Sequence, residues 1–171
     1  MYRIVVVAVN SPQDYSGGRY HAWMMVEALA ALGHEVSVWT NHLPVFLPDF
    51  KSFPAHGKIR IFVDKRFARF PQAAFDIVVM VPHMGEPLDL FYKTMMLARH
   101  HEARLVLLNF ETPNWFNAFS PEPRSPRMWN GWRAVASISD LVLSSAREGT
   151  RWAKAFYHDV PAATRFVHCY P

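Results

Sequence analysis

The stretch Ile4-Val5-Val6-Val7-Ala8-Val9 decides the fold together with three later segments: Ser16-Gly17-Gly18, a helix-forming segment from Tyr20 to Leu32, and Glu35-Val36-Ser37-Val38-Trp39-Thr40. The first run is apolar at every position, as expected of a strand buried on both faces of a parallel sheet. Gly33 stands where the end of a helix often requires a left-handed residue. Together these segments predict a βαβ unit, in which a helix crosses between two parallel strands.

The same alternation continues to the end of the chain. Further strands are predicted at Lys58–Val63, Asp76–Val81, Arg104–Phe110, Asp140–Ser144 and Thr164–His168. Further helices are predicted at Pro87–His101, Ser125–Ile138 and Ala146–Tyr157. The pattern predicts one Rossmann-like domain over residues 1–171, an α/β fold with a doubly wound, mainly parallel sheet of about seven strands and helices on both faces.

The composition excludes several classes of protein. With 51% apolar and 19% charged residues, the 171-residue chain is not intrinsically disordered. A net charge of +4 is too small to indicate nucleic-acid binding. The single cysteine, Cys169, cannot form an internal disulfide, which favours a reducing, cytoplasmic location. No apolar run approaches the ~20 residues that a membrane span needs.

One segment interrupts the alternation. Asn41–Gly57 holds Pro44, Pro48 and Pro54, which argue against a long helix or a central strand. Long irregular connections are often lids or binding loops. The alternative is a loop whose aromatic residues pack onto the core.

The residues just after the strands are the candidates for ligand binding, because an open parallel sheet binds ligands beyond the carboxyl ends of its strands. After the first strand, Gly17 and Gly18 precede a helix whose first N–H groups attract anions, and glycine allows close approach to them. Arg19 adds a positive charge. We therefore predict a phosphate or diphosphate site at these three residues. The turn has neither the GxGxxG pattern of dinucleotide-binding folds nor a Walker loop.

Gly17-Gly18, the helix containing His21 and Leu29, and the run Ala31–Val38 together resemble the opening of the GT-B glycosyltransferases of the group 1 type (family 4). Asp140–Ser145 is similar to the last buried strand of that family before a helix at the cleft. The resemblance implies the N-terminal, acceptor-side half of a retaining hexosyltransferase that works without a metal or other cofactor. Such an enzyme transfers a sugar from a nucleotide-sugar, such as a UDP- or GDP-sugar, to a glycan or lipid-linked glycan in polysaccharide biosynthesis.

The resemblance also implies a partner domain. In the family, a C-terminal domain carries most nucleotide contacts and a Glu-x7-Glu motif, and the reacting atoms meet between the two halves. We expect that domain to be missing from these residues, which end where the interdomain linker should begin, and we expect the chain alone to be inactive. Glu27 and Glu35 have the Glu-x7-Glu spacing, but they flank Gly33 on a helix and a strand and cannot form that site.

His83 and Glu111 are the candidate catalytic residues. By resemblance, a histidine after the fourth strand lines the cleft near the donor sugar, where it can bind hydroxyl groups or stabilise the leaving diphosphate. Glu111 lies just after the fifth strand beside Asn109 and Trp115, a set that suits a sugar acceptor. The alternatives are a surface histidine and a glutamate that only caps the next turn.

Two more segments each have a functional and a structural interpretation. Ser145 and Arg147 lie just after the sixth strand, where the resemblance implies a cleft wall, whereas a simpler interpretation is a capping serine and a solvated arginine. The run Lys65-Arg66-Phe67-Ala68-Arg69-Phe70 either contacts an anionic surface, such as the inner face of a membrane, or a phosphate-bearing acceptor, or forms a solvated turn with packed phenylalanines.

The remaining patterns indicate residues of the hydrophobic core rather than residues that bind or react with a ligand. Trp129 and Trp132 have the spacing of a core stripe rather than of a sugar platform. No spacing of His, Cys or carboxylate residues predicts a zinc site. Two other functions remain open: a standalone flavodoxin-like module that binds a small anion or a protein partner, and a nucleotide-dependent oxidoreductase or epimerase, which the missing fingerprint disfavours.

Overall fold

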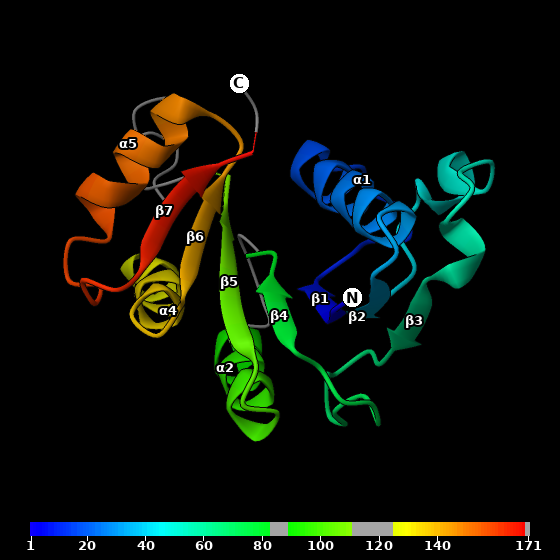
Figure 1. The fold of residues 1–171 in the computed structure, drawn as a ribbon, viewed down its shortest axis with the longest axis horizontal. Helices are drawn as coiled ribbons and strands as arrows, with labels where there is room; N and C mark the ends of the chain where they lie inside the picture. Colours follow the sequence, from blue (N-terminus) through cyan, green and yellow to red (C-terminus); the bar gives the residue numbers. More distant parts are fainter. Residues whose placement is uncertain (83–88, 111–124, 170–171) are drawn as a thin grey trace.

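The computed structural model describes residues 1–82, 89–110 and 125–169, which form a seven-stranded sheet with helices on both faces (Figure 1). The strands are β1 (Arg3–Ala8), β2 (Glu35–Thr40), β3 (Arg60–Val63), β4 (Ile77–Met80), β5 (Arg104–Asn109), β6 (Leu141–Ser144) and β7 (Arg165–His168). The helices are α1 (Gly17–Ala31), α2 (Asp89–His100), α4 (Pro126–Ala136) and α5 (Arg147–Phe156), with short 3₁₀ helices η1 (Leu47–Phe50) and η2 (His56–Lys58). The predicted fold class is confirmed.

The sheet order is β3-β2-β1-β4-β5-β6-β7, and every neighbouring pair is parallel. The chain therefore winds from β1 to β2 and β3 on one side, then returns to β4 and winds in the other direction. Val6 of β1 is paired with Val38 of β2 on one side and with Val79 of β4 on the other. The winding direction thus changes between β1 and β4.

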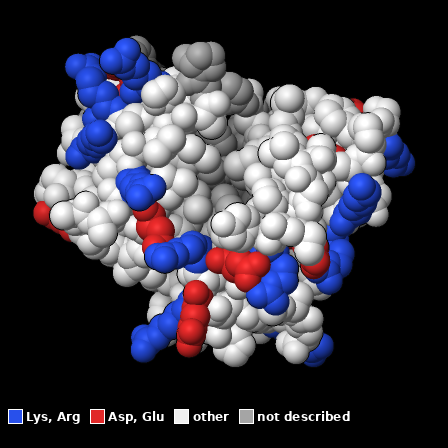
Figure 2. All heavy atoms as spheres, viewed as in Figure 1, with Lys and Arg blue, Asp and Glu red and all other residues white. Residues whose placement is uncertain are grey.

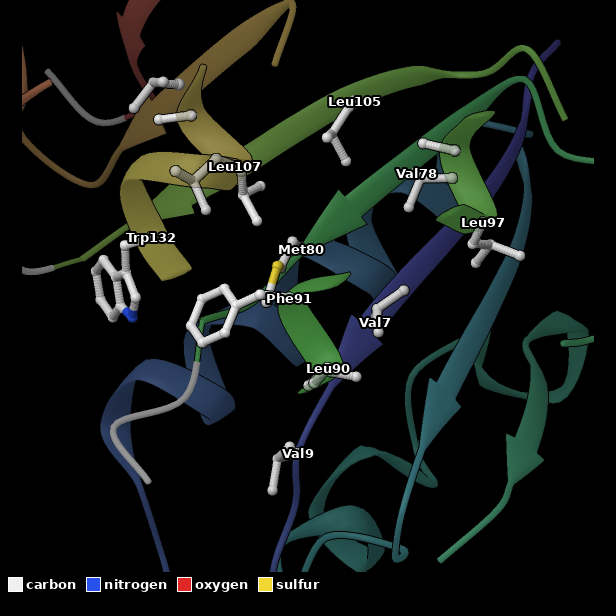
Figure 3. Packing of buried hydrophobic residues seen from close by; sticks show 14 of the residues in the cluster. Val7, Val9, Val78, Met80, Leu90, Phe91, Leu97, Leu105, Leu107 and Trp132 are labelled. Carbon is white, nitrogen blue, oxygen red and sulfur yellow. The ribbon is translucent and has the colours of Figure 1, made fainter. Parts of the chain in front are cut away.

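Side chains of the strands alternate between two hydrophobic clusters, one on each face of the sheet. Ile4 and Val6 face α1, η1 and η2, whereas Val5 and Val7 belong to the cluster that holds α2, α4 and α5. Figure 3 shows part of the second cluster, in which residues of β1, β4 and β5 pack against Phe91 of α2 and Trp132 of α4. This double burial explains why the central strands are apolar at consecutive positions.

Two helix ends form as their sequences predict. Gly33 comes after α1 with φ +88°, a left-handed conformation that glycine adopts without steric cost. Ser125 caps α4, since its hydroxyl accepts the N–H of Arg127 at 3.2 Å, and Pro126 occupies the first helical position. Both features confirm the predicted helix boundaries to within a residue or two.

The aromatic residues of segment 41–57 belong largely to the core. Phe46 and Phe50 are buried, and the Phe50 ring lies 5.0 Å from that of Tyr20 and 6.2 Å from that of Trp23. The packing interpretation is thus confirmed for these two residues, and a role of the segment as a lid or binding loop stays a prediction.

Trp129 and Trp132 are likewise core residues, as predicted. Both are buried in α4, with their ring centroids 5.1 Å apart. Among the described residues, no helix is long and apolar enough to cross a membrane.

Candidate functional site

The candidate site lies at the carboxyl edge of the sheet, where the direction of winding changes between β1 and β4. In open α/β sheets, the connections that leave two such strands run to opposite faces and open a crevice between them. Here β1 leads to α1 on one face and β4 leads towards α2 on the other. The polar residues at the ends of β1, β4, β5 and β6 are therefore the ones to consider.

Helix α1 begins at Gly17, three residues earlier than the sequence predicts, so both glycines lie inside its first turn. Ser16 takes the N-cap position with φ −142° and ψ 124°, but its side chain makes no capping hydrogen bond. Tyr20 donates its N–H to the carbonyl of Ser16 at 2.9 Å, which closes the first turn. The earlier N–H groups, which side chains usually cap, receive no acceptor from Ser16.

Neither backbone conformation nor packing requires glycine in this turn. Among the described glycines only Gly33 has a positive φ. A Cβ added at Gly17 would meet no atom within 4 Å, and one at Gly18 would make an ordinary contact of 3.5 Å with the Phe110 ring. The two glycines therefore leave bare backbone that a ligand can approach closely.

Arg19 comes directly after the glycines and is half-buried. Burial lowers the pKa of its guanidinium, an effect that nearby Asp14 partly offsets. None of the ion pairs within residues 1–82, 89–110 and 125–169 includes Arg19. A partly desolvated cation beside open N–H groups favours an anion at this position.

The Phe110 ring lies close to Gly18, in the first turn of α1. Phe110 directly follows Asn109, the last residue of β5, so the first turn of α1 lies against the end of β5. Figure 1 agrees, since the dark-blue start of α1 points towards the end of β5. The structure therefore places Gly18 against Phe110, whereas the side chain of the predicted cleft residue Asn109 contacts Tyr157 of the cluster on the other face of the sheet.

Asn109 is buried and held in one orientation. Its Oδ1 accepts the hydroxyl of Tyr157 at 3.0 Å, and burial raises the pKa of Tyr157, so this hydroxyl stays protonated. Ser144 of β6 lies next to Asn109 in the sheet register and is also buried. Among the described residues, Asn109 Nδ2 and Ser144 Oγ have no hydrogen-bond partner. Such an atom can hydrogen-bond an ordered water or a bound ligand.

The N-cap of the helix after β6 is not the serine that the capping interpretation predicts. Helix α5 starts at Arg147, and the N-cap is Ala146, with φ −144° and ψ 161°, so no serine caps the helix and that alternative is wrong. Ser145 is partly buried and Arg147 is exposed, as the solvated-arginine interpretation predicts. The start of α5, like that of α1, therefore lacks a side-chain cap.

Asn10, two residues after the end of β1, was not predicted as a site residue. Its N–H donates to Asn41 Oδ1 at 2.7 Å and its Nδ2 donates to Thr40 Oγ1 at 2.9 Å. These bonds tie the end of β1 to the end of β2. Asn10 thus fixes the end of the strand that precedes the glycine turn. Its position just after the first apolar run is the sequence signal by which it could have been predicted.

Three predicted site residues, His83, Glu111 and Trp115, lie outside the described residues, so their roles stay predictions. Within the part of the chain that the structure describes, no group of three or more His, Cys, Asp or Glu side chains lies close enough to hold a metal ion.

Comparison with known proteins adds to this geometry. Neither a protein-family model nor a curated protein matches the sequence. Two solved structures share the fold. The chain is similar to Anabaena HepE (Alr3699) in complex with UDP-glucose, with a TM-score of 0.68 and 13% identity over 99% of this chain and 44% of that one. It is also similar to Arabidopsis thaliana UGT89C1 complexed with UDP, with a TM-score of 0.65 and 9% identity over 98% of this chain and 51% of that one.

At these identities the likeness shows the fold alone. The chain spans about half the length of both similar chains. In each of these two proteins, the part that shares the fold of this chain makes up about half of a larger chain.

Proposed function

We propose that this chain is the N-terminal, acceptor-side domain of a retaining glycosyltransferase of the hexosyltransferase type. The enzyme would transfer a sugar from a nucleotide-sugar to a hydroxyl group of a glycan or lipid-linked glycan. The observation that carries the proposal is the uncapped first turn of α1, with two glycines that the fold does not require. The uridine nucleotides bound to both similar proteins support the same class of substrate.

The reaction explains the role that each group would have. As the sugar–phosphate bond breaks, positive charge develops at the sugar carbon and negative charge on the leaving diphosphate. The N–H groups at Gly17 and Gly18 and the cation of Arg19 would stabilise that negative charge. Asn109 Nδ2, fixed by Tyr157, and the hydroxyl of Ser144 would bind oxygen atoms of the substrates. His83 and Glu111, with Trp115, Ser145 and Arg147 along the cleft, would orient donor and acceptor.

The proposal requires a second domain that brings the donor to this edge. The chain alone should therefore release no measurable UDP or GDP from nucleotide-sugars in a coupled assay. Turnover by the 171 residues alone would contradict the two-domain mechanism.

The diphosphate site is tested by titrating the ¹⁵N-labelled chain with UDP and with inorganic diphosphate. We expect the largest amide shifts at Gly17, Gly18 and Arg19. Gly17→Ala should lower the affinity for both ligands about tenfold, because the methyl group displaces the anion from the N–H groups and weakens charge-assisted bonds. The same substitution should not destabilise the fold and should raise its stability by up to about 1 kcal/mol, since alanine favours a helix.

Gly57→Ala is the matched control. Gly57 also has no atom within 4 Å of an added Cβ, but it lies in η2, just before β3 begins. Its substitution should leave both affinities unchanged. Largest shifts at another part of the molecule, or equal affinities of Gly17→Ala and the parent, would overturn the proposed site.

A further inference from the structure

The segment after β3 holds its cations on a fixed loop. The Asp64 carboxylate accepts the N–H groups of three residues of this loop, Arg66 at 3.1 Å, Ala68 at 2.8 Å and Arg69 at 2.9 Å. Phe67 is 1% exposed in a left-handed conformation, φ 49°, and its ring lies 5.0 Å from that of Trp39. The packed-phenylalanine interpretation is thus confirmed for Phe67. The three cations of the loop are exposed: Lys65, Arg66 and Arg69.

This loop lies against α2. Lys93 of α2 donates to the carbonyl oxygen of Arg66 at 2.8 Å, and the rings of Phe70 and His100 are 6.2 Å apart. In Figure 1 the loop and α2 lie next to each other at the bottom of the view. The fixed cations therefore border the outer surface of the helix.

The outer surface of α2 is apolar and hollowed. Tyr92 is 61% exposed and Met96 43%, and with Arg99 they share one side of the helix at spacings of four and three residues. They line a hollow of about 880 Å³ together with Phe70 and Ile138. A second hollow of about 590 Å³ adjoins it, since Phe70 and His100 line both, and Arg69 lines the second.

The charges around these hollows are mainly positive. Of the neighbouring acids, Asp64 is bound to backbone N–H groups and Asp89 pairs with Lys93 at 2.6 Å, while Glu102 lines the larger hollow. None of the ion pairs formed by the described residues includes the four exposed cations Lys65, Arg66, Arg69 and Arg99. An apolar floor with a cationic rim matches an interface whose outer layer is anionic and whose inner layer is apolar.

We propose that the α2 patch, defined as Lys65, Arg66, Arg69, Tyr92, Met96 and Arg99, docks on an anionic lipid surface. Its cations bind lipid phosphates, and Tyr92 and Met96 enter the interfacial layer. The fixed loop supports this role, because little backbone entropy is lost when its cations bind. The proposal uses residues away from the carboxyl edge and does not depend on the proposed function.

The test is sedimentation of the chain with large unilamellar vesicles of phosphatidylcholine that contain 0, 15 or 30% phosphatidylglycerol. Binding should rise with the phosphatidylglycerol fraction and fall with added salt. Each cation near such a surface contributes about a fivefold change in partitioning, so Lys65→Gln with Arg69→Gln should weaken binding about 25-fold. Tyr92→Ser with Met96→Ser should weaken binding at least fivefold through loss of apolar burial while leaving the salt dependence in place.

The control carries the same change in net charge elsewhere. Lys154 and Arg165 are exposed on α5 and β7, at the opposite edge of the sheet from β3. Lys154→Gln with Arg165→Gln should bind vesicles within about twofold of the parent, apart from the small effect of net charge.

A second measurement reports which surface touches the lipid. The chain has one cysteine, the exposed Cys169, so an environment-sensitive dye can be placed there or, with Cys169→Ser, at Met96→Cys. Vesicles should shift the emission of the dye at position 96 to the blue and leave the dye at Cys169 unchanged. Absence of binding at 30% phosphatidylglycerol, equal loss in the control variant, or a shift only at Cys169 would overturn the proposal. A patch that instead joins two copies of the chain would show a dimer in solution and no blue shift on vesicles, which also overturns it.

Discussion

The two edges of the sheet differ in how far their polar side chains are paired. At the amino edge, side chains of neighbouring strands or their flanking residues pair with each other: Arg3 with Asp76, Arg60 with Glu35 at 3.5 Å, and Arg104 with Asp140 at 2.6 Å. Figure 2 shows Lys and Arg side chains beside Asp and Glu side chains in a row across the molecule. At the carboxyl edge, Asn10 bonds Thr40 and Asn41, but Asn109 Nδ2 and Ser144 Oγ are buried without a partner among the described residues.

From this difference we expect the polar groups of one edge to act on stability and those of the other edge to act on ligand binding. The polar groups of the amino edge are used by the fold, so their removal should lower stability without changing ligand affinity. An unpaired buried hydroxyl such as that of Ser144 costs free energy in the unliganded chain, so its removal should change affinity without lowering stability. Substitutions on each edge test this separation.

The largest change in stability is expected for Asp140→Ala at the amino edge. The Asp140 carboxylate accepts the N–H of Leu105 at 2.9 Å as well as Arg104 Nη1, and Leu105 is buried. Its loss leaves that N–H without a side-chain acceptor, which costs about 1–3 kcal/mol in urea unfolding. Asp140→Asn keeps an acceptor for the N–H and should lose less than half as much. A fall in UDP affinity with unchanged stability would contradict the expectation that polar groups at the amino edge act on stability alone.

A smaller, pH-dependent change is expected at Arg3 and Asp76. Hydrogen bonds from the Arg3 side chain and backbone lower the pKa of Asp76 from 3.8 to about 2. Because the pKa is lower in the folded state, its stabilisation is complete above about pH 5 and is lost as the pH falls through 2 to about pH 1. Asp76→Asn should therefore be less stable than the parent at pH 6, by a smaller margin near pH 2 and by none near about pH 1, as measured by urea unfolding at each pH.

Both side chains of this pair are partly exposed, 45% for Arg3 and 34% for Asp76, so salt should screen the effect. The difference between parent and variant at pH 6 should shrink in about 1 M NaCl. A difference that stayed as large at about pH 1 as at pH 6 would show that Asp76 acts through something other than its charge.

The fold could be predicted because its signals are local. Apolar runs, Gly33 and the Ser125-Pro126 cap each act through near neighbours in the chain, and the structure has strands and helices where these signals place them. The start of α1 was predicted three residues late because glycine is a poor helix former, whereas Gly17 and Gly18 form the first turn. The cap of α5 was assigned to a serine because serine is a preferred cap, whereas Ala146 takes that position.

The candidate site was only partly predictable, since it depends on contacts between distant residues. Gly17, Gly18, Arg19 and Asn109 were found because they lie at or just beyond the ends of apolar runs. Tyr157 was missed because its bond to Asn109 spans 48 residues and leaves no local pattern. The unpaired state of Ser144 Oγ depends on how β5, β6 and α5 pack, which no spacing in the sequence specifies.

The smallest effect on stability, and the sharpest test of the comparison, is expected from two serines. Ser144 and Ser37 are both buried, and the hydroxyl of each lacks a partner among the described residues, but Ser37 lies near the middle of β2 and Ser144 ends β6. Replacing either by alanine removes an unpaired buried hydroxyl. The free energy of unfolding should therefore stay within about 0.5 kcal/mol of the parent or rise slightly.

Ligand binding should separate the two variants. If the Ser144 hydroxyl is kept for a substrate oxygen, Ser144→Ala should weaken binding of UDP-glucose or GDP-mannose by about threefold to tenfold, the size of one hydrogen bond. Ser37→Ala should bind as the parent does, because its hydroxyl does not reach the carboxyl edge. Equal binding by both variants would mean that the unpaired hydroxyl at the end of β6 is a tolerated packing defect, and the difference between the two edges would then concern stability alone.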